Sequence, residues 1–193
     1  MNKVLYVFID SSGSMAEMGK ILLQRNLCRF ISQLPSINNK YLKLDIDFYN
    51  WNSSITAFNL QSNGDIPEII PQETVDLNTL ASFLYDLSTK DQQKDIYVLL
   101  LTDGGFESGS ISKFNRKVNK FSNLKLQVVA VGADANIFNL EKILPNQKVY
   151  LAEDISGAVY SLIFDHSNDG VAPVSIHDLK TSKTEVVEDD WDA

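Results

Sequence analysis

The order of hydrophobic and polar positions predicts strands that alternate with helices along most of the chain. Short runs of β-branched and aromatic residues are typical of buried strands, and apolar residues recurring every three or four positions are typical of amphipathic helices. This alternation predicts an α/β fold, namely a doubly wound, mostly parallel sheet of about six strands with helices on both faces. The predicted buried strands are residues 4–9, 96–101, 124–131 and 148–151, and the predicted helices are residues 15–34, 80–87, 111–121, 136–144 and 155–164.

Two further strands are predicted at residues 41–50 and 55–60. Residues 41–50 alternate between apolar and polar side chains, which is typical of a half-exposed strand. Only four residues separate the two strands, too few for a helical crossover, so we expect an antiparallel hairpin at one edge of the sheet. Pro35 is expected to end the first helix. The polar stretch at residues 61–76 is predicted to be a long loop with room for a short strand near residues 68–70.

Oxygen-bearing side chains follow the first predicted strand. Asp10, Ser12 and Ser14 have the spacing D-x-S-x-S, which places one carboxylate and two hydroxyls on a single tight loop. In open α/β sheets, ligands bind in the crevice outside the carboxyl ends of the strands. An oxygen-only ligand set with little charge suits Mg²⁺ or Mn²⁺ better than zinc.

A second acid, Asp103, follows the predicted strand at residues 96–101 within the sequence Thr102-Asp103-Gly104. We expect Asp103 to face Asp10 across the crevice. The sequence shows no obvious basic partner for the two carboxylates, so a divalent cation would be the simplest neutraliser of their repulsion. The alternative is that these oxygens only cap helices and tie loops.

In these two motifs the chain resembles the von Willebrand factor A family, whose metal-ion-dependent adhesion site begins with D-x-S-x-S and includes a second Asp. The resemblance covers about residues 3–165, and a domain at residues 1–166 is expected. The family completes its site with a Thr. Thr79, at the start of the predicted helix, is assigned to that role, with Thr74 as the alternate.

The resemblance also implies a coordination scheme and a function. Ser12, Ser14 and Thr79 would hold the metal directly, and Asp10 and Asp103 would act mainly through water. One coordination position would stay open for an Asp or Glu carboxylate of a protein partner. The stand-alone bacterial members of the family, including those of the tellurium-resistance type, are the most similar, which suggests a kinase or phosphatase of a bacterial stress system as the partner.

Composition narrows the function classes. With 193 residues, 44% of them hydrophobic, the chain can form one α/β domain with a sizeable core. A formal net charge of −8 argues against a nucleic-acid partner. The apolar runs are too short for a membrane span, and the run at residues 4–9 is too short for a secretion signal, so a cytoplasmic location is expected.

The competing class is an enzyme, namely a metal-dependent phosphotransferase or hydrolase that uses the same crevice between Asp10 and Asp103. Neither His166 nor His177 lies at a predicted strand end, where it could activate a nucleophile. No phosphate-binding glycine motif follows a strand. The sequence therefore predicts a binding module without catalytic residues.

The last segment, residues 167–193, is expected to be a flexible acidic tail, with five acids among its final nine residues. Trp191 within this acidic run resembles a short docking motif, and the alternative is an incidental Trp without a binding role. Because the tail carries carboxylates on a tether, capture of the chain's own metal site by the tail is a further hypothesis.

Overall fold

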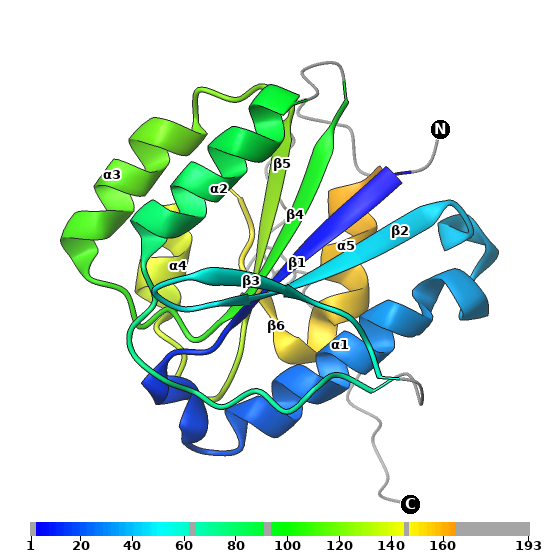
Figure 1. Ribbon diagram of the computed structural model, residues 1–193, viewed down its shortest axis with the longest axis horizontal. Helices are drawn as coiled ribbons and strands as arrows, with labels where there is room; N and C mark the ends of the chain where they lie inside the picture. Colours follow the sequence, from blue (N-terminus) through cyan, green and yellow to red (C-terminus); the bar gives the residue numbers. More distant parts are fainter. Residues whose placement is uncertain (1–2, 62–64, 91–93, 145–146, 165–193) are drawn as a thin grey trace, which may run out of the picture.

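The computed structural model describes residues 3–61, 65–90, 94–144 and 147–164. These residues form a sheet in the strand order β3-β2-β1-β4-β5-β6 (Figure 1). The strands are β1 (Lys3–Asp10), β2 (Leu44–Trp51), β3 (Ile55–Phe58), β4 (Ile96–Thr102), β5 (Leu124–Ala130) and β6 (Tyr150–Leu151). The helices are α1 (Lys20–Ile37), α2 (Leu77–Lys90), α3 (Ser108–Val118), α4 (Ile137–Ile143) and α5 (Ile155–Phe164).

The pairing of the strands confirms the predicted topology. β1 lies at the centre and pairs in parallel with β2 and β4, and the parallel pairing continues through β5 to β6. β3 alone runs antiparallel, beside β2 at the edge. The fold is therefore the expected α/β sheet of six strands with one antiparallel edge strand.

Helices cover both faces of the sheet, and β1 contributes alternate side chains to each side. Leu5, Val7 and Ile9 pack in one apolar cluster together with residues of α1 and α5. Phe8 points to the opposite face and packs with residues of α2, α3 and α4. Burial on both faces explains why β4 is a continuous apolar run, since every residue of that strand is buried.

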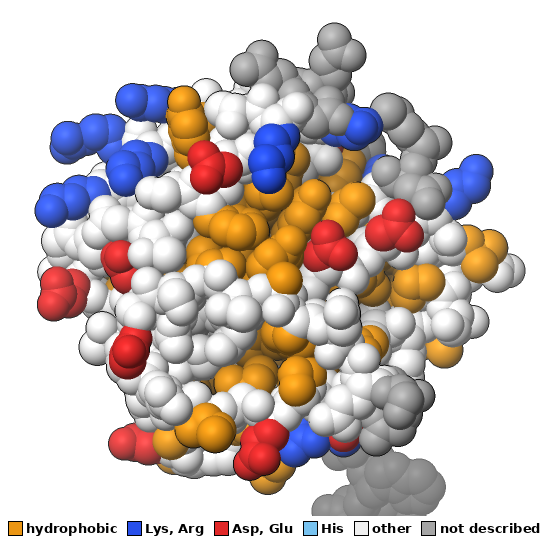
Figure 2. Space-filling view, viewed as in Figure 1, with side chains coloured by type: hydrophobic (Ala, Val, Ile, Leu, Met, Phe, Trp, Pro, Cys, Tyr) orange, Lys and Arg blue, Asp and Glu red, His pale blue; other side chains and the backbone are white. Residues whose placement is uncertain are grey.

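On the α2 side, the outer part of the sheet is covered by aromatic side chains. Tyr49 of β2 stacks on Phe8 at 5.1 Å between ring centroids and meets Phe83 of α2 edge-on at 5.0 Å. Figure 2 shows hydrophobic side chains gathered at the surface over β1 and β2, beside α2. Basic side chains gather over α3 in the same view, as a charged helix face in contact with solvent.

Three local predictions were wrong. The helix predicted from residue 15 begins at Lys20, after a 3-10 turn at Gly13–Ala16. Pro35 does not end it, because the helix runs on to Ile37, where Asn38 N–H still bonds to the Leu34 carbonyl. Residues 68–70 form no strand. They lie in an irregular segment that contributes the side chains of Ile66 and Ile69 to the core. No helix in the described part of the chain is long and apolar enough to cross a membrane.

Candidate metal centre

The carboxyl ends of β1 and β4 bring the two motifs together. The strands pair in register through Ile9 and Leu101, so Asp10 and Thr102 end side by side. Asp10 Oδ2 accepts a hydrogen bond of 2.5 Å from Thr102 Oγ1. The next residue along, Asp103, is 5% exposed and lies at the same edge.

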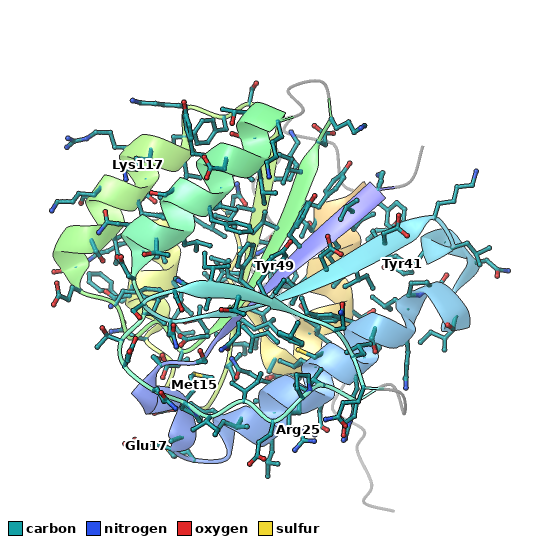
Figure 3. All side chains as sticks on the ribbon, viewed as in Figure 1. Met15, Glu17, Arg25, Tyr41, Tyr49 and Lys117 are labelled. Atoms are coloured by element: carbon teal, nitrogen blue, oxygen red, sulfur yellow. The ribbon has the colours of Figure 1, made fainter. Side chains whose placement is uncertain are left out.

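The loop after β1 folds back on the Asp10 carboxylate. Asp10 Oδ1 accepts hydrogen bonds from the backbone N–H of Ser12 at 2.8 Å and from its hydroxyl at 2.6 Å. The hydroxyl oxygens of Ser12 and Ser14 lie 3.1 Å apart, so the D-x-S-x-S spacing places three oxygens in one chain of contacts. Figure 3 labels Met15 and Glu17 in this loop.

Asp103 faces the same loop from β4. Its Oδ1 accepts a hydrogen bond of 3.0 Å from the N–H of Gly105. A Cβ atom placed on Gly105 would lie 3.2 Å from Asp103 Oδ1 and 3.5 Å from Ser14 Oγ. These two oxygens therefore border one open position that any larger residue at 105 would fill.

The structure does not place Thr79 in this group of contacts. Its hydroxyl donates to Asp76 Oδ2 at 2.8 Å and lies 3.2 Å from the Ser53 carbonyl, within the first turn of α2. The loop that carries the alternate, Thr74, does contact the D-x-S-x-S loop. The N–H of Gly13 donates to the Glu73 carbonyl at 3.0 Å, and the side chain of Thr74, the next residue, is exposed.

Lys20 corrects the expectation that the two acids have no basic partner. Its ammonium group lies 2.9 Å from Asp103 Oδ2 and 2.7 Å from Asp134 Oδ2, and the Lys20 side chain is 2% exposed. Repulsion between Asp10 and Asp103 is thus partly offset within the chain itself. A metal remains compatible with the site but is not required to neutralise it.

Gln24 is a second residue that the sequence reasoning missed. Its side-chain amide donates to the carbonyls of Asp10 at 2.9 Å and Leu101 at 3.1 Å, which ties the ends of β1 and β4 together. The helical periodicity of the sequence could have revealed both Lys20 and Gln24. Gln24 stands one turn and Lys20 two turns before Cys28 on the buried face of α1, where polar residues need specific partners.

Burial changes the proton affinity of Asp10. Desolvation raises its pKa from an ordinary value of 3.8 to about 6, against hydrogen bonds from Ser12 and Thr102 that lower the pKa. The neighbouring charge of Asp103 adds to the rise. At neutral pH the carboxylate is therefore ionised and poorly solvated, a state that a cation would stabilise.

The chemistry of the donor set fits a hard divalent ion. Asp10, Ser12, Ser14 and Asp103 offer carboxylate and hydroxyl oxygens only, and the position beside Gly105 is open. Within the described residues, no group of three or more His, Cys, Asp or Glu side chains is placed to hold a metal ion. The few carboxylates are consistent with an ion that keeps several waters.

Comparisons with known proteins rest on structure alone. No protein-family model matches the sequence, and no curated protein matches it significantly. Among solved structures, the manganese-loaded TRAP protein of Plasmodium vivax is similar with a TM-score of 0.57 and 18% identity over 83% of this chain and 72% of that one. The ArnB paralog VWA2 of Sulfolobus acidocaldarius gives a TM-score of 0.60 and 18% identity over 83% of this chain and 44% of that one.

A third similar structure is proximal thread matrix protein 1 from the mussel byssus, with a zinc-occupied MIDAS motif. Its TM-score is 0.53 and its identity is 14%, over 84% of this chain and 47% of that one. The chain thus spans less than half the length of the VWA2 and mussel chains that it matches. At these identities the likeness shows the fold, and this chain therefore has the fold of the von Willebrand factor A domains.

Proposed function

We propose that the chain is a metal-dependent protein-interaction module that binds an acidic side chain of a partner. The observation that carries the proposal is the convergence of Asp10, Ser12, Ser14 and Asp103 at one end of the central strands. The hydroxyl groups lie beside exposed glycines, Gly13 and Gly105, so a partner group can approach them.

Mg²⁺ or Mn²⁺ is the proposed ion. Ser12, Ser14 and Thr74 would hold it directly, with Asp10 and Asp103 contributing mainly through water. We name Thr74 in place of Thr79 because the Thr79 hydroxyl is already engaged by Asp76. When bound, the ion supplies an electrophilic position that a carboxylate can fill. The manganese in the TRAP structure and the zinc in the mussel structure support a divalent ion on this fold.

The rim of the site would make partner binding depend on the ion. Glu17, Glu73 and Glu107 are exposed and stand next to or near the residues of the site along the chain. These negative charges would repel an acidic partner in the absence of a cation. A bound divalent ion would offset part of this negative charge and offer the partner's carboxylate a ligand position.

Titration of the full chain with Mg²⁺ and Mn²⁺ by calorimetry tests the metal. Parent protein should bind, and D10A should lose binding, because the Asp10 carboxylate organises both the loop and the ion. E141A removes an exposed acid from α4 and is the matched control that should bind as the parent does. Equal affinities in the parent and D10A would overturn the site.

A pull-down with and without chelator then tests the interaction. The expected result is a partner retained by the parent only when the divalent ion is present, and lost in D10A. If the partner were retained in chelator and by D10A as well, it would bind elsewhere on the chain.

The second candidate function is a metal-dependent phosphotransferase or hydrolase at the same crevice. Its support is the buried Asp10 with its raised pKa, since perturbed acids are common in active sites. Both His residues lie outside the described residues, and Lys20 is bound to two carboxylates. Metal-dependent turnover of a phosphoester by pure protein, lost in D10A, would favour this enzyme.

The cellular setting is proposed from the resemblance alone. Members of the tellurium-resistance type suggest a cytoplasmic bacterial protein whose partner is a kinase or phosphatase of a stress system. Co-purification of such an enzyme in a metal-dependent manner would support this setting.

A further inference from the structure

The side chain of Lys20 connects the metal centre to a third acid. It extends from the first residue of α1 to the carboxyl edge of the sheet, where its ammonium group bonds to Asp103 at 2.9 Å and to Asp134 at 2.7 Å. It also donates to the Ser14 carbonyl at 3.3 Å. One buried cation thus contacts both motifs of the centre and an acid outside it.

The path of this side chain is built into the fold. Gly132, after β5, has φ of +97°, and a Cβ atom there would lie 2.9 Å from Lys20 Cε and 3.0 Å from its Cγ. Only a glycine both adopts this backbone conformation readily and leaves space for the aliphatic chain. Asp134, two residues further on, is 39% exposed and holds the ammonium from the solvent side.

Lys20 fixes which carboxylate oxygen of Asp103 faces the hydroxyl groups of the site. The lysine bonds to Oδ2, whereas Oδ1 accepts from Gly105 N–H and borders the position beside Ser14 Oγ. One carboxylate oxygen is therefore occupied by Lys20, and the other is directed toward the hydroxyl groups. Burial by itself would lower the pKa of Lys20, but hydrogen bonds and charges from Asp134 and Asp103 raise it, so the ammonium stays charged at neutral pH.

We propose that Lys20 is a positioning residue that orients Asp103 and, as an internal cation shared with Asp134, limits how tightly the centre binds a divalent ion. The inference rests on the proposed function, since it concerns the affinity of the same site. Lys20 repels an incoming cation and also keeps the fold intact without one. Asp134 offsets part of that repulsion.

Opposite changes are therefore expected on the two sides of the Lys20–Asp134 pair. K20M keeps an unbranched side chain beside Gly132 but removes the positive charge, so divalent affinity should rise about tenfold or more. D134N leaves the charge of Lys20 without its outer partner, so affinity should fall about twofold to fivefold, a smaller effect because Asp134 is partly exposed to screening solvent.

Calorimetric titration of the full-length parent, K20M and D134N with Mg²⁺ and Mn²⁺ measures these affinities. E107Q is the matched control for D134N, because it removes the same charge from an exposed acid near the centre that bonds to no lysine in the described structure. E107Q should weaken binding less than D134N does. Affinity in K20M that equals or falls below that of the parent overturns the inference.

Thermal unfolding provides a second readout. In the presence of chelator, the parent should still unfold cooperatively, and K20M should have a midpoint temperature roughly 5 °C or more below that of the parent. The reason is that K20M leaves Asp103 buried without a counterion. Saturating Mg²⁺ should restore much of that loss in K20M. A K20M midpoint that does not respond to the ion contradicts the proposed role.

The outcomes separate this inference from the proposed function. If neither the parent nor K20M binds an ion, the metal-dependent function itself fails. If the parent binds and K20M does not bind more tightly, only the role of Lys20 fails. Should K20M not fold, the comparison of D134N with E107Q decides, since equal affinities in those two variants refute the role of Lys20.

Discussion

Replacing Asp10 by Asn should stabilise the metal-free protein while removing its ability to bind a divalent ion. Asp10 is 1% exposed, and its carboxylate is held by Ser12 and Thr102. An Asn side chain has nearly the same shape. Its carbonyl can accept from Ser12, and its amide can donate to the Thr102 hydroxyl once that hydroxyl turns its proton away.

The expected gain follows from the pKa of Asp10. Its rise from 3.8 to about 6 on folding means that the folded chain binds this proton more tightly than the unfolded chain does. Stability from this group is therefore fully present below about pH 4 and is lost as the pH rises through 6. At about 1.4 kcal/mol per pH unit, the ionised carboxylate destabilises the metal-free fold by about 3 kcal/mol at pH 7.5.

Urea unfolding in chelator at pH 4, 6 and 7.5 tests this expectation. D10N should exceed the parent by up to about 3 kcal/mol at pH 7.5 and by much less at pH 4, where Asp10 is protonated. E141Q, which changes an exposed acid, should follow the parent at every pH. A D10N protein no more stable than the parent at pH 7.5, or with the same gain at pH 4, would refute the reasoning.

Three further outcomes are expected. T74A should weaken Mg²⁺ binding in calorimetry and leave stability unchanged. T79A should keep its metal affinity but lose about 1 kcal/mol of stability in urea unfolding, because the hydrogen bond to Asp76 is lost. The reverse pattern would assign the metal-binding role to Thr79. Q24L should lower stability by about 2 kcal/mol in the same unfolding assay, because two strand-end carbonyls lose a buried donor, and a loss near zero would contradict that role. Truncation after Phe164 removes the acidic tail, which lies outside the described residues, and should tighten partner binding if the tail captures the site. Unchanged affinity would mean that the tail is a solubilising segment, and weaker affinity would mean that it is a docking segment.

The sequence by itself determined the elements and much of the topology. Buried strands and amphipathic helices leave different periodicities, because a strand alternates its side chains between two faces and a helix repeats every 3.6 residues. The connection between β2 and β3 is only three residues long (52–54) and left no room for a crossover, so their antiparallel pairing followed from chain length alone. The contacts among Asp10, Ser12 and Ser14 followed from local spacing as well.

Only the tertiary structure decided what surrounds these oxygens. Lys20 and Asp103 are 83 residues apart, and their ion pair depends on how α1 packs across the ends of β1 and β4. The roles of Gln24 and of the loop beside Thr74 also depend on segments that meet only in the folded chain. A periodic pattern reports which side of an element is buried, but it carries no record of the distant residue that it will contact there.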